Sequence, residues 1–355
     1  MNNVLTVIVM ATSDCNMDCG YCYAKLSRRS IKSLDVSCLK NLIQNISSGF
    51  DSIEFCWHGG EPLLVGTDFY REALKFQREE MEKRKVRFRN VVQTNGFLLS
   101  GKTLDFLVEN GFSIGLSVDA PQDIFRLHRG ADIEPLLAVC GEIKRRNIPL
   151  QVLCVVSAAN VGRGKEIFSF FQSLGVDSFG LLPLRYVSEV YPPPPTNENL
   201  FTLYKTVFDL WAWTPNNFSS IEPLNTMLRS LLGERPQYCS FAGSCLKKMI
   251  AVDQEGNVVP CVSLAGRDSF VLGNVLEQPL VEILATNRAN ELRNMRARCV
   301  SQRCGKCPFV ASCRGGCRAE AVWATGRYDG IYPFCEARRM TFEYLQSHFL
   351  SKIPR

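Results

Sequence analysis

Three cysteines near the amino terminus have a spacing suited to holding a metal cluster. Cys15, Cys19 and Cys22 form a C-x3-C-x2-C pattern within the segment CNMDCGYC. Thiolates bind zinc and iron–sulfur clusters, and a closed site of either kind normally takes four protein ligands. Three thiolates therefore leave one metal position open for a substrate or cofactor. A closed zinc knuckle is disfavoured because the fourth ligand is missing and the chain has only three histidines.

A second group of cysteines lies in the last third of the chain. Its members are Cys239, Cys245, Cys261, Cys304, Cys307, Cys313, Cys317 and Cys335. Eight thiolates suffice for two four-cysteine iron–sulfur clusters. A zinc ribbon is the alternative, but it normally shows two C-x2-C pairs, and here only Cys304 and Cys307 form one.

Five cysteines remain outside these two groups. Cys56, Cys140 and Cys154 lie in apolar strand or helix patterns and are expected to be small core residues, and Cys38 is expected to be structural as well. Cys299 precedes Cys304 by only five residues, so it stays a candidate ligand or reactive thiol.

The elements that position these residues alternate between strand and helix patterns from Val4 to about Arg185. The predicted strands are Val4–Met10, Ser52–His58, Val86–Gln93, Ser113–Val118, Leu150–Val156 and Ser178–Leu184. The predicted helices between them are Leu39–Ile46, Phe69–Met81, Thr103–Glu109, Pro135–Arg145 and Glu166–Leu174. Six such units predict an α/β fold with a parallel sheet, and because a closed barrel needs eight, we expect a partial, open (βα)6 TIM-like barrel.

Polar residues follow the predicted strands, where such folds gather their functional groups. Gly59, Gly60, Glu61 and Pro62 follow the second strand in the segment WHGGEP. Asn95 follows the third strand, Ser117 and Asp119 end the fourth, and Arg129 lies farther on in HRG. Two glycines allow close backbone approach, a carboxylate can accept from an ammonium, and a guanidinium can grip a carboxylate with two hydrogen bonds.

The first cysteine pattern, with Tyr21 just before its last member, resembles the signature of the radical S-adenosylmethionine (radical SAM) superfamily. The resemblance implies a 4Fe-4S cluster whose fourth iron is chelated by S-adenosylmethionine, which is cleaved to a 5′-deoxyadenosyl radical. The segment GGEP resembles the family motif that binds the methionine amino group. By the same resemblance Asn95 and Ser117 are candidate partners for ribose or carboxylate, and Arg129 is a candidate carboxylate clamp. For Asp119 the sequence is equally compatible with a turn-capping role and with a cofactor contact.

The second cysteine group resembles the SPASM domain that extends many peptide-modifying radical SAM enzymes. The resemblance implies one auxiliary cluster on Cys239, Cys245, Cys261 and Cys317, and another on Cys304, Cys307, Cys313 and Cys335. The segment Met249–Pro260 reads as a hairpin with its turn at Glu255–Asn257, which would hold Cys245 and Cys261 at its two ends.

These patterns predict three parts of the chain. Residues 1–190 form the radical SAM partial barrel, and residues 237–355 form the SPASM domain with short helices. The segment 191–236 between them opens with the polyproline run Tyr191–Asn199, which suits a semi-rigid connector, and continues with bridging helices.

Composition excludes several other classes of protein. Hydrophobic residues make up 46% and charged residues 21% of the chain, which argues against disorder, collagen and coiled coil. The amino terminus lacks a signal-peptide pattern and no long apolar run predicts a membrane span, so we expect a cytoplasmic protein without a membrane partner. The net charge of +6 comes from scattered runs without interleaved aromatics, so no nucleic-acid partner is expected.

The cysteine layout is closest to that of the anaerobic sulfatase-maturating enzymes, which oxidise a cysteine or serine to formylglycine. In that family an aspartate, the proposed base, follows the cysteine equivalent to Cys261, whereas this chain has Val262. Valine cannot accept a proton, so the sequence favours a peptide maturase that forms an intramolecular C–C or C–S crosslink in a ribosomally made precursor peptide. Formylglycine formation and dehydrogenation of a small molecule are the alternatives. An electron carrier without catalysis is disfavoured, because it would need neither GGEP nor an open three-cysteine site.

The expected partners follow from this interpretation. Many relatives carry an amino-terminal leader-binding domain, for which Cys15 leaves no room, so leader recognition would need a separate protein, another surface, or strand addition at an open barrel edge. The electron donor is expected to be flavodoxin or ferredoxin. The catalytic base is unknown, and Tyr186, Glu189 and Asp268 are candidates without motif support.

Overall fold

A computed structural model describes residues 4–27, 31–185 and 191–349. The chain folds as two compact units, each built from segments that are far apart in the sequence. Unit 1 contains Met1–Asp18, Cys22–Gly115 and Ser244–Asn294. Unit 2 contains Cys19–Tyr21, Leu116–Gly243 and Met295–Arg355.

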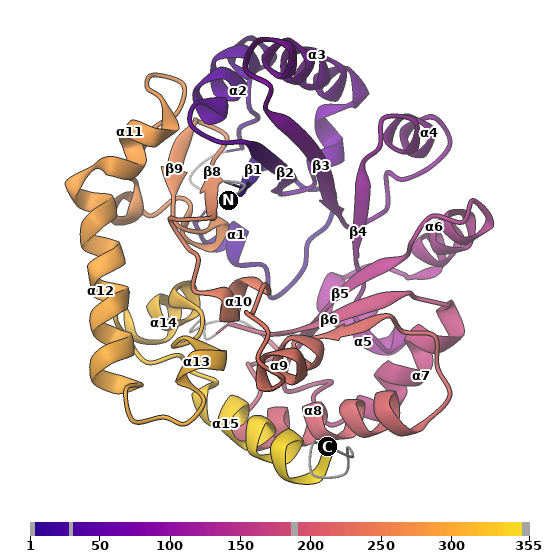
Figure 1. Cartoon of the computed structure of the whole chain (residues 1–355). Coiled ribbons are helices and arrows are strands. Elements are labelled where there is room, and N and C mark those ends of the chain that lie inside the picture. The colour runs from indigo at the N-terminus through magenta and orange to yellow at the C-terminus, as the bar shows by residue number, and fades with distance from the viewer. Residues whose placement is uncertain (1–3, 28–30, 186–190, 350–355) are drawn as a thin grey trace. The chain divides into compact units, whose positions relative to one another are not determined.

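The sheet of unit 1 is built on three parallel strands, β1 (Val4–Thr12), β2 (Ser52–Gly59) and β3 (Arg87–Thr94). Alternate side chains of β1 and β2, such as Val7 and Phe55, are fully buried and lie opposite each other in the register. Helices α2 (Leu39–Ser47) and α3 (Thr67–Arg84) lie on the same side of these strands, and α4 (Lys102–Glu109) follows β3 (Figure 1). Each strand ends at a loop that carries part of the predicted site.

A hairpin from much later in the chain extends this sheet beyond β1. Strand β8 (Met249–Val252) pairs parallel to β1, with Ile250 opposite Val7. Strand β9 (Asn257–Val259) pairs antiparallel to β8, and the short β10 (Gly273–Asn274) pairs antiparallel to β9. Helix α11 (Leu280–Ala285) then packs on α2. The predicted hairpin is therefore confirmed, and it belongs to the same sheet as the strand that leads into the first cysteine pattern.

The strands of unit 2 are also parallel. Strand β5 (Gln151–Val156) pairs with β6 (Ser178–Pro183), and β6 pairs with the short β7 (Ser220–Glu222). Helices α5 (Gln122–Arg129), α6 (Glu134–Arg145) and α7 (Gly164–Leu174) complete the βα repeats. Strand β4 (Ser113–Ser117) is divided between the two units.

The remaining helices follow the βα repeats in the chain. They are α8 (Asn197–Trp213), α9 (Leu224–Leu231), α10 (Cys239–Ala242), α12 (Asn287–Arg303), α13 (Val310–Cys313), α14 (Arg318–Thr325) and α15 (Cys335–Tyr344). Shorter turns are helix α1 (Tyr23–Ser27), the 3-10 helices η1 (Val36–Cys38), η2 (Pro62–Val65), η3 (Val262–Leu264) and η4 (Asp268–Phe270), and a π-helix, Leu345–Phe349. Helix α15 packs against α8 within unit 2.

All six predicted strands and the five predicted helices between them are present, so the predicted α/β class is confirmed. The structure adds α5 and β7, which the sequence analysis did not predict. It also starts α8 at Asn197, inside the run that was expected to remain extended, because the Thr196 side chain accepts from the Asn199 backbone N–H and caps the helix. In the described parts of the chain, we find no helix with the length and apolar character needed to cross a bilayer.

Candidate functional site

In unit 1 the first cysteine pattern begins in the loop after β1. The Asp14 backbone N–H donates to Thr12 Oγ1 at 3.0 Å, and the Cys15 N–H donates to Asp14 Oδ1 at 2.9 Å. These bonds turn the chain out of the strand and direct it into the cysteine segment. Burial raises the pKa of the Cys15 thiol, and the neighbouring Cys22 and Glu61 act in the same direction. A thiol in these surroundings is held protonated unless a metal supplies positive charge.

The two glycines of GGEP lie against this loop. A Cβ on Gly59 would be 2.2 Å from the Thr12 carbonyl oxygen, and a Cβ on Gly60 would be 1.8 Å from the Asp14 carbonyl oxygen. The Gly60 N–H donates to Thr12 O at 2.8 Å, and the Glu61 N–H donates to Asp14 O at 2.7 Å. The two glycines therefore allow the end of β2 to approach the cysteine loop closely, and the predicted cofactor contact of GGEP stays a prediction.

Glu61 joins the ends of β2 and β3. Its carboxylate is almost fully buried and accepts from Thr94 Oγ1 at 2.7 Å, from the Asn95 N–H at 2.8 Å and from the Leu63 N–H at 3.0 Å. Burial raises its pKa, while these hydrogen bonds oppose the rise. Pro62 is buried as well and starts η2. Gly60, Glu61 and Pro62 thus hold the ends of β2 and β3 next to the cysteine loop.

Asn95 reaches the cysteine loop from β3. Its Nδ2 lies 2.7 Å from Asn16 Oδ1 and 3.9 Å from Cys15 Sγ, and its Oδ1 accepts from the Phe97 N–H. A cofactor contact of Asn95 stays a prediction. In unit 1 this side chain supports the cysteine segment and provides an N–H group near one of its sulfurs.

In unit 2 a buried network is centred on Asp119. This carboxylate accepts from Tyr21 OH at 2.8 Å, from Arg129 Nε at 3.0 Å and from the Val155 backbone N–H at 2.8 Å. His128 Nδ1 lies 3.3 Å from the same carboxylate. Although burial alone would raise the pKa of Asp119, Arg129 and His128 lower it to about 2. Asp119 is therefore the ionised acceptor at the centre of this network and is more than a turn cap.

This network also holds the middle of the cysteine segment. The Gly20 N–H donates to the His128 carbonyl at 3.0 Å, and the Tyr21 ring meets the His128 ring edge to face with centroids 5.3 Å apart. Burial works to lower the pKa of Arg129, but Asp119, Tyr21 and Cys19 together raise it. Cys19, Tyr21 and Arg129 thus share one neighbourhood of unit 2. Ser117 ends β4 and is half-buried.

The proposed ligands of the second auxiliary cluster gather within unit 2. Cys304 follows α12, Cys307 comes one turn later, Cys313 ends α13 and Cys335 begins α15. Burial raises the pKa of Cys335 to about 11, and Cys313, Cys304 and Cys307 all add to this effect. The four sulfurs are therefore electrostatic neighbours although their residues are up to 31 positions apart in the sequence.

The proposed ligands of the first auxiliary cluster are divided between the units. In unit 1, Cys245 forms a bridge to Met249 before β8, and Cys261 lies just after β9, with its Sγ 3.5 Å from Ser263 Oγ. These two cysteines flank the hairpin, as predicted. In unit 2, Cys239 starts α10 and Cys317 precedes α14.

The donor chemistry of both cysteine groups fits iron–sulfur clusters. Among the described residues, no three His, Cys, Asp or Glu side chains are close enough together for a single metal ion. A four-iron cluster spaces its thiolates more widely than one ion does, and the four neighbouring thiols of unit 2 are all partly accessible or exposed. An all-sulfur donor set of this kind suits 4Fe-4S rather than a hard cation.

Other candidates from the sequence have clear positions. Cys140 and Cys154 are fully buried, and burial raises the pKa of Cys140 to about 11 and that of Cys56 to about 12, consistent with structural roles. Cys38 precedes α2. Asp268 is exposed at the start of η4, and Tyr186 and Glu189 lie outside the described residues.

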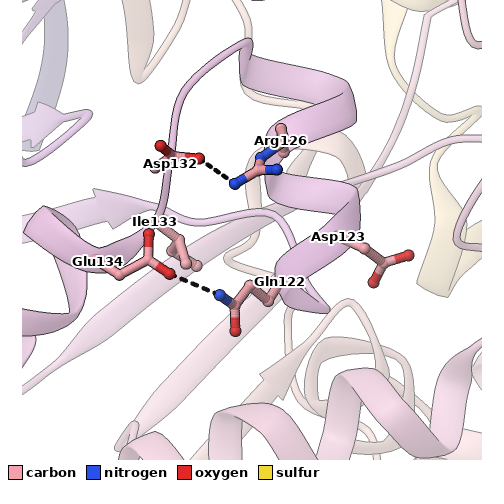
Figure 2. Close-up of a pocket in the computed structure, with 6 residues that line it drawn as sticks. All are labelled: Gln122, Asp123, Arg126, Asp132, Ile133 and Glu134. Carbon is pink, nitrogen blue, oxygen red and sulfur yellow. Dashed lines mark hydrogen bonds and ion pairs between the residues drawn. The ribbon is translucent and has the colours of Figure 1, made fainter.

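A surface pocket of about 470 Å³ lies beside α5 in unit 2. It is lined by Gln122, Asp123, Arg126, Asp132, Ile133 and Glu134, and Figure 2 shows the Arg126–Asp132 ion pair and the Gln122–Glu134 hydrogen bond that join its walls. None of the predicted site residues lines it, so it does not enlarge the candidate site.

Sequence reasoning missed one buried histidine, two buried arginines and the importance of Asp119. His128 and the central role of Asp119 were not foreseen, although the run HRG at the end of a helix offered a signal. The buried arginines Arg318 and Arg338 were missed because an arginine in a sequence is normally assigned to the surface.

Comparison with known proteins shows to which class of protein the chain belongs. Residues 9–167 match the model of the Radical SAM superfamily, and residues 239–308 match SPASM, an iron–sulfur cluster-binding domain. The chain is therefore a radical SAM enzyme that carries a SPASM domain. Its cofactors are S-adenosylmethionine and 4Fe-4S clusters.

Its relatives include sulfatase-maturating enzymes. The chain is 28% identical to the cysteine-type anaerobic sulfatase-maturating enzyme of Clostridium perfringens, with 95% of each chain covered. It is 24% identical to the serine-type enzyme of Bacteroides thetaiotaomicron, covering 93% of this chain and 86% of that one. The solved structure of native anSMEcpe with bound AdoMet and Cp18Cys peptide superposes with a TM-score of 0.87 at 25% identity, and the match covers 98% of both chains.

Proposed function

We propose that this enzyme oxidises a cysteine or serine side chain of a peptide substrate to formylglycine. The observation that carries the proposal is the match to anSMEcpe over 98% of both chains, since that protein was solved with AdoMet and the Cp18Cys peptide. The curated relatives of the cysteine and serine types support the same chemistry. This replaces crosslinking, the reaction that the sequence favoured, as the leading candidate.

Cys15, Cys19 and Cys22 would hold the cluster with the open iron. When bound, the cluster and S-adenosylmethionine supply a 5′-deoxyadenosyl radical that removes a hydrogen atom from a substrate carbon. Within unit 1, the Gly60 and Glu61 backbone N–H groups hold the loop that leads into Cys15. Within unit 2, Asp119 accepts from Tyr21, which lies between Cys19 and Cys22 in the sequence. We propose flavodoxin or ferredoxin as the electron donor.

Val262 is the observation that favours a second candidate. It is 8% exposed and packs with Met10, Ala251, Val259 and Ala265 in an apolar cluster. A carboxylate here would be costly to ionise, and valine cannot take up a proton. In a crosslink the substrate radical bonds to a neighbouring residue, and the second hydrogen leaves as a proton and an electron, so no sulfide is released and no oxygen is introduced. Under that alternative, leader recognition would fall to a separate leader-binding protein.

The two candidates differ in their products. Formylglycine formation from cysteine removes two hydrogens and exchanges sulfur for oxygen, and from serine it removes two hydrogens, in both cases leaving an aldehyde. A crosslink removes two hydrogens and leaves no aldehyde. An aldehyde-reactive hydrazide combined with tandem mass spectrometry therefore separates the reactions for every substrate.

The test incubates the anaerobically reconstituted enzyme with S-adenosylmethionine, dithionite and one of three peptides. These are a cysteine-type sulfatase peptide, its serine counterpart, and a small peptide encoded beside this protein. We expect hydrazide labelling of a sulfatase peptide, and none with the Cys15, Cys19 and Cys22 to alanine variant. Unlabelled sulfatase peptides, together with a neighbouring peptide that loses two hydrogens between linked side chains, would establish crosslinking instead.

A Val262→Asp variant tests the missing base. If proton transfer at this position limits the reaction, the variant should form more aldehyde per S-adenosylmethionine cleaved than the parent enzyme. A Val259→Asp variant places the same charge in the same apolar cluster, three residues away, and should give no such gain.

A further inference from the structure

Two arginines are buried beside the carboxy-terminal cysteines of unit 2, and neither has a role in the proposed reaction. Arg318 is 1% exposed and Arg338 is 5% exposed. A buried cation is destabilising unless it is paired, so each guanidinium requires an electrostatic explanation.

Arg338 is held against a proposed cluster ligand. Its Nη1 donates to the Ser240 carbonyl at 3.0 Å and to Cys313 Sγ at 3.7 Å, and its Nη2 donates to Ser240 Oγ at 2.8 Å. The guanidinium lies 3.8 Å from the centre of the Phe241 ring and 4.1 Å from that of the Tyr332 ring. Two aromatic rings and two hydrogen-bond acceptors on Ser240 therefore fix its orientation towards the sulfur.

Arg318 is buried among backbone carbonyls and a thiol of unit 2. Its Nη1 donates to Cys299 Sγ at 2.9 Å and to the Gly330 carbonyl at 2.9 Å, and its Nη2 donates to the Gly315 carbonyl. A Cβ on Gly315 would be 3.8 Å from Cys304 Sγ and 3.9 Å from Arg318 Nη2, so the guanidinium and this sulfur flank the same backbone position. The positive charge of Arg318 therefore lies near a second proposed ligand.

No carboxylate among the described residues accepts a hydrogen bond from either guanidinium. The nearby acid is Glu320, whose Oε1 lies 3.0 Å from Arg185 Nε. Burial raises the pKa of Glu320, with Arg185 and then Arg338 opposing the rise. Glu320 supplies a single negative charge and is paired with Arg185, so it cannot balance the charges of both Arg318 and Arg338.

A bound cluster would account for them. A 4Fe-4S centre with four thiolates carries an overall charge of minus two when oxidised and minus three after taking up one electron, with no bond made or broken. Two guanidinium charges balance the oxidised state and attract the added electron. Net charge and hydrogen bonds to sulfur are the main protein controls on the potential of such centres.

We propose that Arg338 and Arg318 raise the reduction potential of the auxiliary cluster on Cys304, Cys307, Cys313 and Cys335. They act on electron uptake through the cluster ligands and not by contact with the substrate. Their two positive charges balance the two negative charges of the oxidised cluster. The proposal goes beyond the proposed function and depends on the cluster ligands but not on which peptide is the substrate.

The experiment measures potentials without substrate. Cys15, Cys19 and Cys22 are replaced by alanine so that only auxiliary clusters contribute, and the holoprotein is titrated with dithionite and followed by electron paramagnetic resonance. Arg338→Met removes the charge at similar volume, Arg338→Lys restores a charge, and Arg318→Met tests the second cation. Arg339→Gln is the matched control because Arg339 follows Arg338 on α15 but is exposed and paired with Glu336 and Glu343.

With iron content equal to that of the parent, Arg338→Met and Arg318→Met should each shift one auxiliary signal to a more negative midpoint potential. Arg338→Lys should recover part of the shift, and Arg339→Gln should cause none. Unchanged potentials in both methionine variants, or an equal shift in Arg339→Gln, would overturn the proposal. Because either methionine variant could lose its cluster, the parent labelled with 15N-arginine gives a second test. Its reduced auxiliary signal should show 15N hyperfine coupling, and the absence of coupling would contradict the Arg338–Cys313 contact.

Discussion

Replacing Asp119 by asparagine should destabilise the protein far more than its small change in shape suggests. Asp119 is fully buried and is the ionised acceptor for Arg129 and Tyr21. Asparagine keeps the size of the side chain and one acceptor oxygen but removes the charge. Arg129 would then be a buried cation without its carboxylate.

Two independent arguments give the size of the effect. The pKa of Asp119 is lowered from 3.8 to about 2 in the folded protein, and at about 1.4 kcal/mol per pKa unit this corresponds to roughly 2 kcal/mol. Removal of one partner from a buried ion pair costs about 3–5 kcal/mol. We therefore expect the free energy of unfolding to fall by about 3 kcal/mol, enough to reduce occupancy of the first cluster because Tyr21 belongs to the cysteine segment.

The pH dependence has a definite sign. The folded-state pKa is lower than the unfolded one, so the stabilisation from Asp119 is fully present above the usual aspartate range and is lost as pH falls towards 2. The difference between the parent and Asp119→Asn should therefore not vary with pH around neutrality.

Anaerobic urea unfolding followed by tryptophan fluorescence measures the loss. Asp132→Asn is the matched control. Asp132 pairs with Arg126, which lies on α5 together with Arg129, but the side chains of Asp132 and Arg126 are both more than half exposed. The control should cost less than about 1 kcal/mol. Equal losses in the two variants, or a loss in Asp119→Asn that grows from pH 6 to pH 8, would refute the buried-pair reasoning.

Three further outcomes are expected. Gly60→Ala should lower S-adenosylmethionine cleavage by about a hundredfold in a 5′-deoxyadenosine assay, because the new Cβ would lie 1.8 Å from the Asp14 carbonyl oxygen and displace the cysteine loop. Gly141→Ala is the control and should be neutral, because its Cβ would meet no atom within 4 Å. Reconstituted protein should bind about twelve irons by colorimetric analysis, and stoichiometric zinc would contradict the cluster assignment. Alanine at Cys15, Cys19 and Cys22 should abolish cleavage, while folded Cys304→Ala or Cys335→Ala should retain some cleavage and lose product formation. Equal loss of cleavage in both sets would show that the clusters do not divide these tasks.

Cofactor class could be predicted from the sequence because its evidence is local. The three cysteines of the first pattern lie within eight residues, and GGEP is four consecutive residues, so their spacing survives any arrangement of the rest of the chain. The six strands were predictable for a similar reason. Their buried positions recur along short apolar runs, and β1 and β2 keep that pattern in the structure.

The assignment of partners within the site needed the tertiary structure. The sequence made Arg129 a candidate for a cofactor carboxylate, but its Nε donates to Asp119, which also accepts from Tyr21, 98 residues away. The sequence likewise predicted the hairpin around Gly256 but could not show that β8 pairs with β1. Both results depend on which strands become neighbours, and hydrophobic patterns do not specify this.

Burial of charge was the feature least visible in the sequence. Arg338 and Arg339 are adjacent and identical in type, yet one is buried beside Cys313 and the other is exposed and paired with Glu336. Their difference arises because successive residues of a helix point in different directions, and only packing decides which direction faces the cysteines. The sequence therefore determined which atoms can bind the clusters, and the tertiary structure decided which charges surround them.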